Sequence, residues 1–456
     1  MRNAIHFLRA AWCDIILVES GGKYAMIDTG MAEHADRIIA YLDRLRVTHL
    51  EWILITHFHR DHYGSLPALL EKYPVNRVYM KKFSGLVIND GAGHPADQAF
   101  NDAEIQKCEQ MCALCGEVSS LTVIDASVDR VQLGDFDFRI FGNTDAIREM
   151  YEDPASPWYH EIHFGENTNS VALYALVGGT AIYLGADAQN DALPEYPRYD
   201  RQNARYAREI GRKIDLYKVP HHGCGHLFDE ETLRILQPRV SLVTNWDWTW
   251  NRNFAANRDL LRAASPEGEI LVTDRCGYVF TLGPDGQMTR ETLDPLPTVS
   301  AVEVNPEEQA DFQAARKQHL AEDGILLDDG TMPVCYTCGG CRQAASGTDG
   351  NGAHLPRRFW LIREGKRIGA ALVLPDDPEP GCWHILDFWV FKPLRGRGAG
   401  HFCYEALEKL CVGLGAKSFL LRCEKETVIR FWRAFGFRQT EEGGPFRLIP
   451  PEICPG

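Results

Sequence analysis

The chain has 456 residues, a formal net charge of −15 at neutral pH and 45% hydrophobic residues. This length predicts two or more domains with apolar cores, and no run of about 18 apolar residues is present to span a membrane. Of the 63 acidic and 48 basic residues, 21 and 19 lie in residues 300–456, so the acidic excess belongs to the part before them. Tight, non-specific binding of long nucleic acid needs an excess of lysine and arginine, so the composition disfavours it.

Residues 1–8 lack the long apolar region of a signal peptide, and their pattern predicts a first strand. We therefore expect a cytoplasmic location. In that compartment the fourteen cysteines are expected to be thiols rather than a disulfide framework.

A cluster of ligand-type side chains follows the apolar strand predicted at residues 52–55. Within six positions the chain has His57, His59, Asp61 and His62. Imidazole and carboxylate are ligands that zinc takes. Alternate residues of extended or tightly turning backbone project together, so His57 and His59 can bind one ion and Asp61 and His62 a neighbouring one. The segment predicts a metal site.

Further ligand-type residues end other predicted strands. Asp28 lies near the end of the strand-like run at residues 24–30, Asp187 ends the strand at 181–187, and His221 and His222 follow the strand at 216–220. Each pattern alone is common, but their order and spacing together are specific.

The motif His57-x-His59-x-Asp61-His62, with these residues in this order, resembles the signature of the metallo-β-lactamase superfamily. The resemblance implies a four-layer αββα sandwich with a mono- or binuclear metal centre that mostly catalyses hydrolysis. It also implies that Asp28 supports the metal-binding loop, that Asp187 bridges two ions, and that one histidine of the later pair completes the second site. We expect His221, which follows the strand end most directly, with His222 as the alternative.

The stretch at residues 167–170 and the His-His-Gly sequence resemble one branch of this superfamily, found in bacterial DNA-uptake competence proteins and related phosphodiesterases. That branch usually opens with a Gly-x-Gly-Asp turn, of which only Asp14 remains here. Many relatives place a histidine four residues before the serine equated with Ser170, where this chain has Glu166. A glutamate ligand shifts the preference toward harder ions such as manganese, and His163 is the alternative ligand. We expect one or two ions, zinc or manganese.

The resemblance suggests how the centre would act. A metal-bound water has a pKa lowered from about 15.7 to about 7, and Asp61 is expected both to ligate and to orient the nucleophile. Phosphodiester cleavage is favoured; lactone, thioester or β-lactam cleavage is the alternative. Trp246, Trp248 and Trp250 alternate as on a strand and either form a half-buried face or line a pocket.

Two cysteine groups suggest different structures. Cys108, Cys112 and Cys115 occupy one face of a helix predicted at residues 102–117, which favours a buried stripe over an iron–sulfur site. The second group lies in a Gly-rich segment and allows a zinc knuckle. Its candidate ligands are Cys335, Cys338 and Cys341, with His354 or Cys382 as the fourth.

Two prolines within residues 293–298 predict a boundary, giving domains 1–297 and 298–456. In the second domain a strand at 384–390 leads into a Gly-rich turn and a helix at about 401–414. Glycines at a strand-to-helix turn allow backbone N–H groups to face phosphate, and the helix N-terminus adds positive potential. The turn contains Arg395, Gly396, Arg397, Gly398, Ala399 and Gly400.

This turn, with the closing strand and helix at residues 418–437, resembles the GNAT acetyltransferase family. The resemblance implies a smaller α/β domain with a central mixed sheet, in which the turn and Val390 contact acetyl-CoA. His384 stands where many relatives have a proton-relaying glutamate, and Asp387 on the same strand is a second catalytic candidate. Trp432 stands at the usual position of an acidic tyrosine and cannot donate a proton in its place.

These patterns predict a bifunctional enzyme that joins a metal-dependent hydrolase to an N-acetyltransferase, with a small-molecule substrate and acetyl-CoA as partners. One alternative is a hydrolase whose second domain only senses acyl-CoA. The other is a non-enzymatic binding assembly, which the complete ligand set argues against.

Overall fold

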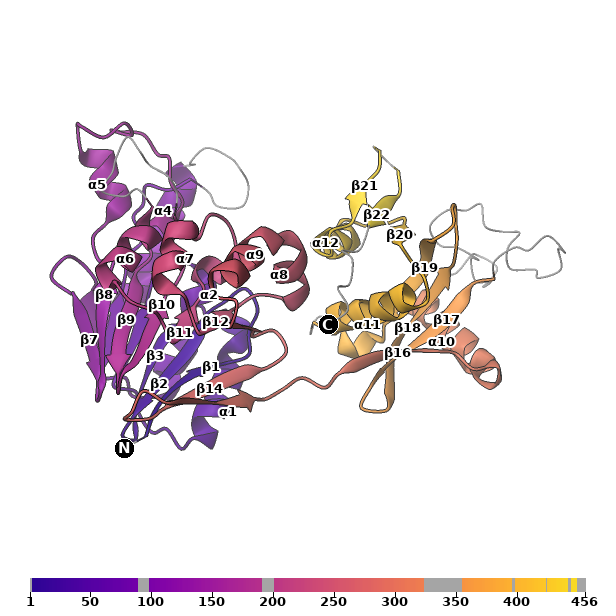
Figure 1. Ribbon diagram of the computed structural model, residues 1–456, viewed down its shortest axis with the longest axis horizontal. Coiled ribbons are helices and arrows are strands. Elements are labelled where there is room, and N and C mark those ends of the chain that lie inside the picture. Colours follow the sequence, from indigo (N-terminus) through magenta and orange to yellow (C-terminus); the bar gives the residue numbers. More distant parts are fainter. Residues whose placement is uncertain are drawn as a thin grey trace. The chain divides into compact units, whose positions relative to one another are not determined.

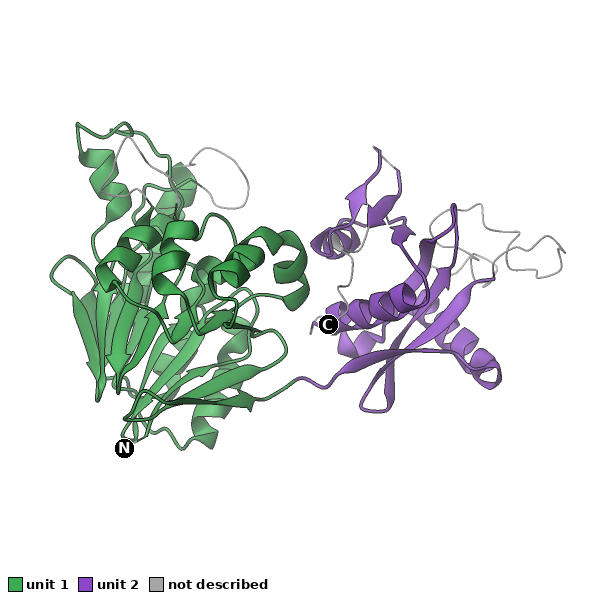
Figure 2. Cartoon of the chain, in the orientation of Figure 1, with its two compact units in different colours: residues 1–295 green, residues 296–456 purple. Residues whose placement is uncertain are grey.

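The computed structural model describes residues 2–88, 98–190, 201–323, 355–395, 398–423, 425–441 and 444–448. The chain divides into two compact units, Met1–Pro295 and Leu296–Gly456 (Figure 2). The division falls within two residues of the boundary expected from the prolines. Within the described ranges, no helix is long and apolar enough to cross a membrane.

Two sheets form the centre of the N-terminal unit (Figure 1). In spatial order, the first contains β15 (Met288–Leu293), β14 (Gly277–Leu282), β1 (Asn3–Phe7), β2 (Ile15–Ser20), β3 (Lys23–Thr29), β4 (Trp52–Ile55), β5 (Arg77–Met80) and β6 (Ser120–Val123). The second contains β13 (Glu269–Val272), β12 (Val240–Val243), β11 (Leu216–Lys218), β10 (Thr180–Leu184), β9 (Ala172–Val177), β8 (Phe136–Phe141) and β7 (Arg130–Leu133).

The sheets pack face to face through one apolar layer. Val18 and Phe280 from the first sheet and Phe138 and Ile182 from the second belong to this core. All residues of β2 and β10 are buried, as expected for strands covered on both faces. Burial of each large aliphatic side chain in these strands stabilises the unit by about 1.5–3 kcal/mol.

Helices cover both outer faces. Ile38 of α1 (Ala35–Arg44), Leu69 of α3 (Leu66–Lys72) and Cys115 of α4 (Gln98–Val118) pack on the first sheet. On the second sheet lie α6 (Gln202–Ile210), α7 (Glu230–Leu236) and α9 (Ala255–Ala264). The predicted four-layer αββα sandwich is therefore confirmed.

The C-terminal unit contains a mixed sheet, as predicted. Its order is β16 (Val299–Glu303), β17 (Arg357–Arg363), β18 (Lys366–Leu374), β19 (Cys382–Val390), β20 (Ser418–Leu421), β22 (Phe446–Leu448) and β21 (Arg438–Gln439). Its helices are α10 (Gln309–Glu322), α11 (Ala399–Gly413) and α12 (Glu426–Ala434). The parallel pair β19 and β20 has its register over residues 382–384 and 418–420, so three residues of β19, Ile385, Leu386 and Asp387, lie between this pairing and Phe388.

Two local expectations have clear outcomes. The tryptophan segment is a helix, α8 (Asp247–Asn253), so the predicted strand is wrong. Trp250 packs against Gly223, where an added Cβ would lie 2.6 Å from its ring, so tertiary packing overrides the period-two pattern. The cysteine stripe is confirmed on α4, with Cys108 and Cys115 buried. The three candidate knuckle cysteines and His354 lie outside the described residues, and Cys382 is buried in β19.

Candidate functional site

The candidate metal ligands follow the carboxyl ends of parallel strands. In the first sheet β3 and β4 are parallel; Asp28 lies at the end of β3, and residues 56–62 follow β4. In the second sheet β10, β11 and β12 are parallel, and Asp187, His222 and Thr244 follow them. Because parallel strands end at the same sheet edge, each sheet presents its polar residues at one edge.

One carboxylate oxygen is common to three histidines. Oδ2 of Asp187 lies 3.8 Å from Nε2 of His57, 3.4 Å from Nε2 of His62 and 3.5 Å from Nε2 of His222. Zinc–nitrogen and zinc–oxygen bonds of about 2.0–2.2 Å place tetrahedral ligand atoms roughly 3.3–3.6 Å apart. The separations from His62 and His222 match that spacing, and the separation from His57 is 0.2 Å longer.

The candidate ligands form two groups that share Asp187. The first comprises His57, His59 and Asp187, and the second comprises Asp61, His62, Asp187 and His222. Nε2 of His57 lies 3.0 Å from Nδ1 of His59, and Nε2 of His222 lies 3.3 Å from Oδ2 of Asp61. The arrangement can hold two cations with one bridging carboxylate.

Asp28 fixes the orientation of His62. Its Oδ2 lies 2.8 Å from Nδ1 of His62 and also accepts the Thr56 hydroxyl, while its Oδ1 accepts the Thr56 amide. The carboxylate therefore favours a proton on Nδ1 of His62, which leaves Nε2 for a cation.

Thr244 and Asp14 fix the orientation of His222 in a similar way. The Thr244 hydroxyl donates to Oδ1 of Asp14 at 2.7 Å, so its oxygen accepts from Nδ1 of His222 at 2.9 Å. The Lys218 ammonium, which is fully buried, pairs with Oδ2 of Asp14 and donates to the Ala186 carbonyl. Nothing in the sequence marked Thr244, whereas a lysine inside an apolar strand was a signal for Lys218.

Burial and charge together set the proton equilibria. Burial alone would lower the pKa of His62 and His222, but the carboxylates, Asp187 foremost, raise both well above the ordinary value. Burial would raise the pKa of Asp187, but the two histidines hold it well below its usual range. Protons would therefore compete with a metal ion for this site and would be released if one bound.

The residues present fit a pair of divalent cations. Among the described residues, Nε2 of His62 and Nε2 of His222 have no hydrogen-bond partner, although carboxylate oxygens lie close to both. Four carboxylates and one ammonium meet here, so with neutral histidines the centre carries three negative charges. The four carboxylates are those of Asp14, Asp28, Asp61 and Asp187, and the ammonium is that of Lys218. Two divalent cations would leave one positive charge.

His221 does not join either ligand group. Its Nε2 lies 3.0 Å from Nδ2 of Asn167, and its Nδ1 lies 3.4 Å from Nε2 of Gln189. Both His221 and His222 have left-handed backbone, with φ of 44° and 52°. The expectation of His221 assumed that the strand direction continues past Pro220. The chain turns at Pro220 instead, and this turn brings His222 into the candidate ligand group.

Glu166 and His163 lie outside both groups as well. Glu166 is fully buried and accepts the Ser84 amide at 3.3 Å. Burial raises the pKa of Glu166 to about 8. The His163 ring stacks on Trp158 at 5.5 Å.

In the C-terminal unit the Gly-rich turn leads directly into α11. Gly398 precedes this helix with a φ of 75°, and Gly400 lies so close to Phe431 that an added Cβ would be 3.2 Å from its ring. A glycine in left-handed backbone before a helix N-terminus suits an approaching phosphate. Gly396 and Arg397 lie outside the described residues.

The Arg395 side chain is held by residues of its own unit. Its Nε donates to the Val390 carbonyl at 2.7 Å, its Nη1 to Asp323 at 2.7 Å and its Nη2 to Nδ1 of His319 at 3.1 Å. The guanidinium thus contacts the end of α10, which sequence reasoning did not include in the site.

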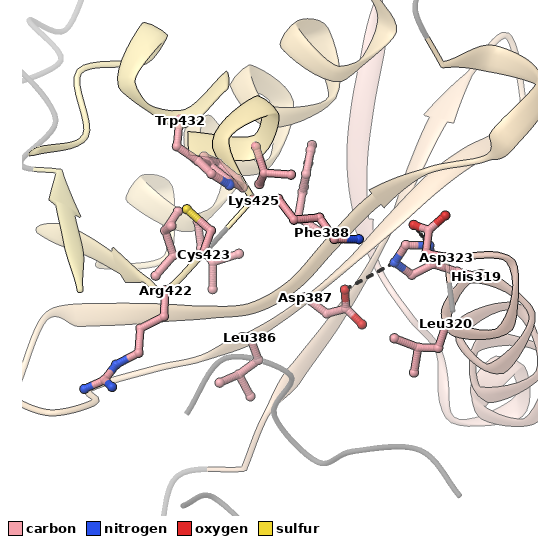
Figure 3. A pocket seen from close by; sticks show the side chains of 13 residues that line it. His319, Leu320, Asp323, Leu386, Asp387, Phe388, Arg422, Cys423, Lys425 and Trp432 are labelled. Carbon is pink, nitrogen blue, oxygen red and sulfur yellow. Dashed lines mark ion pairs between the residues drawn. The ribbon is translucent and has the colours of Figure 1, made fainter. Parts of the chain in front are cut away.

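The two catalytic candidates on β19 differ in their relation to a cavity of about 370 Å³. Asp387 lines it, together with His319, Phe388, Lys425 and Trp432 (Figure 3). His384 does not line it; this side chain is buried, and its Nδ1 lies 2.9 Å from Oδ2 of Asp377.

Two family models match the chain. The metallo-beta-lactamase superfamily matches residues 13–147, and the acetyltransferase (GNAT) family matches residues 341–437. ComE operon protein 3 of Bacillus subtilis (strain 168) is 23% identical over 211 residues, which cover 45% of this chain and 21% of that protein. The chain therefore spans about a fifth of the length of this curated relative.

Solved structures resemble each unit. The metallo-beta-lactamase fold protein YhfI from Bacillus subtilis is 12% identical, with a TM-score of 0.37, and the match covers 64% of this chain and 100% of that chain. A GNAT family acetyltransferase from Brucella melitensis, solved in complex with acetyl-CoA, is 15% identical, with a TM-score of 0.25, and the match covers 35% and 92%.

The support that Asp28 gives to His62 can be tested through metal affinity. We expect Asp28→Asn to weaken zinc binding by about 10–100-fold, because the histidine loses the charge that fixes its tautomer. The measurement is competition with a chromophoric chelator. Asp36→Asn, which removes an exposed carboxylate on α1, should bind as the parent does. Equal affinity in Asp28→Asn and the parent would contradict the role.

Glu166 can be tested by pH and by metal content. Its pKa of about 8 exceeds the ordinary 4.5, so the folded state binds the extra proton and loses stability as pH rises through this window. Glu166→Gln should therefore gain stability over the parent from pH 5 to pH 8, measured by urea unfolding of metal-free protein. Glu161→Gln, at an exposed site, is the control. Loss of one metal equivalent in Glu166→Gln would instead identify Glu166 as a ligand.

Proposed function

Because the chain carries a metallo-β-lactamase domain followed by a GNAT domain, we propose that it is a bifunctional enzyme. The N-terminal unit would be a metal-dependent hydrolase of a phosphodiester or small-molecule ester. The C-terminal unit would transfer an acetyl group from acetyl-CoA to an amine.

The sharing of Asp187 Oδ2 by three histidines carries the hydrolase proposal. Bound cations would polarise the scissile group and activate a water for attack. In this proposal His57, His59, His62 and His222 hold the ions, with Asp187 between them. The single positive charge left by two divalent cations favours an anionic substrate, which supports a phosphodiester over a neutral lactone or thioester.

Asp61 is the proposed catalytic residue of this unit. Its Oδ2 lies 3.3 Å from Nε2 of His222 and 3.8 Å from Nε2 of His62, and its side chain is 22% exposed, whereas those of the two histidines are buried. A carboxylate at the open side of the ligand group can ligate an ion and accept a proton from the attacking water.

For the C-terminal unit, the turn before α11 supports cofactor binding. The pyrophosphate would lie at the N-terminus of this helix, against Gly398, Ala399 and Gly400. The second candidate function is an acyl-CoA sensor. It is favoured by Trp432, which lines the cavity and has no acidic proton for a departing thiolate.

The hydrolase is tested with purified protein of known metal content, loaded with zinc or with manganese. We expect hydrolysis of bis-p-nitrophenyl phosphate rather than of nitrocefin. Asp61→Ala should lower kcat by about 10²–10⁴-fold, and Asp36→Ala should not. Hydrolysis by Asp61→Ala at the parental rate would refute the assignment, and no hydrolysis of either compound by the parent would refute both substrate classes.

The cofactor site is tested by calorimetry with acetyl-CoA. We expect Gly398→Val to abolish binding, because a branched side chain is strained at positive φ and blocks the approach of phosphate. Gly413→Ala, at the other end of α11 and with open space around the added Cβ, is the control and should bind normally. Parental protein that binds but acetylates no amine would favour the sensor, and absence of binding would refute both.

A further inference from the structure

Two arginines of the N-terminal unit, Arg9 and Arg37, have guanidinium nitrogens without a partner. Nε of Arg9 and both Nε and Nη2 of Arg37 are buried, and none of these atoms has a hydrogen-bond partner among the described residues. Within the same ranges neither guanidinium forms an ion pair with a carboxylate. A guanidinium keeps its charge in a protein, and a charge that is removed from water is normally paired. The two arginines depart from that rule.

The two guanidiniums belong to neighbouring parts of the first sheet and its helix layer. Arg9 directly follows Leu8 at the end of β1, and Leu8 belongs to the same apolar cluster as Ile38 of α1. Arg37 precedes Ile38 in the first turn of that helix. Figure 1 shows α1 beside β1 and β14. Each arginine is therefore next in the chain to a residue of this cluster.

The electrostatic effects of the two cations on their surroundings agree with this placement. Burial and then the charge of Arg9 lower the pKa of Arg37 to about 10, which indicates that the two cations repel each other. Burial and then the charge of Arg37 lower the pKa of His34 to about 4, so this imidazole is neutral at neutral pH. Sγ of Cys13 lies 3.4 Å from Nδ1 of His34, which brings the segment after Arg9 against the start of α1.

The carboxylates that act on these arginines do not neutralise them. Burial lowers the pKa of both guanidiniums, and the charge of Asp294 opposes this only in part. Both oxygens of Asp294 already accept from Arg44, at 3.0 Å each. Asp274, which acts on Arg9, is buried, and burial raises its pKa to about 6. Uncompensated positive charge therefore remains in a unit that carries the acidic excess of the chain.

We propose that Arg9 and Arg37 form a binding site for a phosphate-type anion, separate from the metal centre. Planar guanidiniums donate paired hydrogen bonds to phosphate oxygens, so two of them can hold one tetrahedral anion. Both side chains are only half-buried, which leaves part of each within reach of an anion from solvent. Neither arginine belongs to the candidate metal-ligand groups, and the site does not depend on either proposed activity.

The test is thermal unfolding of the full chain in sodium phosphate and in sodium chloride of equal ionic strength. An anion that binds only the folded state raises Tm, and we expect a rise of about 5–10 °C for the N-terminal unit when phosphate exceeds its dissociation constant about 100-fold. Arg9→Gln and Arg37→Gln should each lose this rise, and Arg37→Lys should keep part of it. Phosphate bound elsewhere would stabilise parent and variants equally, so the difference belongs to the two arginines.

Two comparisons separate anion binding from a structural role. In phosphate-free buffer Arg37→Gln should unfold at or above the parental Tm, because it removes the repulsion between two cations. An arginine needed for packing would instead lower Tm by the same amount in both buffers. The control is Arg234→Gln, which removes an exposed arginine of α7 and should respond to phosphate as the parent does.

Adenosine monophosphate in place of phosphate identifies the source of the anion. The site is supported in either case: an equal rise points to free phosphate, and a rise at lower concentration points to the phosphate group of a larger molecule. Equal phosphate responses in the parent and in Arg37→Gln would overturn the inference. So would a parental rise that sodium chloride reproduces, because screening of charge alone would then explain it.

Discussion

The carboxylate of Asp187 is the contact on which the N-terminal site depends. One of its oxygens lies within 3.8 Å of three histidines. His57 and His62 follow β4 of the first sheet, whereas His222 and Asp187 follow strands of the second. The ligand groups therefore exist only while the two sheets pack face to face, and the apolar layer between them is also what sets the geometry of the site.

Local patterns were enough to name part of this candidate site. The segment from His57 to His62 and the strand end before Asp187 are features of neighbouring residues, and each lies in a ligand group. The choice between His221 and His222 depended on two left-handed residues, which no strand pattern predicts. Thr244 supports His222 from 22 residues away, and such a contact follows from the packing of strands rather than from spacing.

In the C-terminal unit, too, local sequence predicts some features, whereas contacts between distant residues set the others. The Gly-rich turn and the start of α11 follow from local sequence, because glycine and a helix N-terminus have fixed conformational roles. The partners of Arg395 do not: Asp323 and His319 lie 72 and 76 residues earlier in the chain. The family resemblance implies that Arg395 contacts phosphate. In the structure Arg395 instead hydrogen-bonds to His319, whose other ring nitrogen lies beside Asp387. Similarly, His384 had the expected sequence position, but its contact is with Asp377.

Buried charge in both units is difficult to explain by stability alone. Removing an ion pair from water costs several kcal/mol per ion, and an apolar replacement of similar volume is often neutral or stabilising. Lys218 with Asp14, and Arg316 with Asp387, are nevertheless almost fully buried. In each pair the carboxylate lies beside a histidine: Asp14 is 3.5 Å from Nδ1 of His222, and Asp387 is 3.6 Å from Nε2 of His319. In each pair the cation neutralises the carboxylate, and the carboxylate orients the neighbouring histidine. The pairs are therefore better explained by this orientation of a histidine than by a gain in stability.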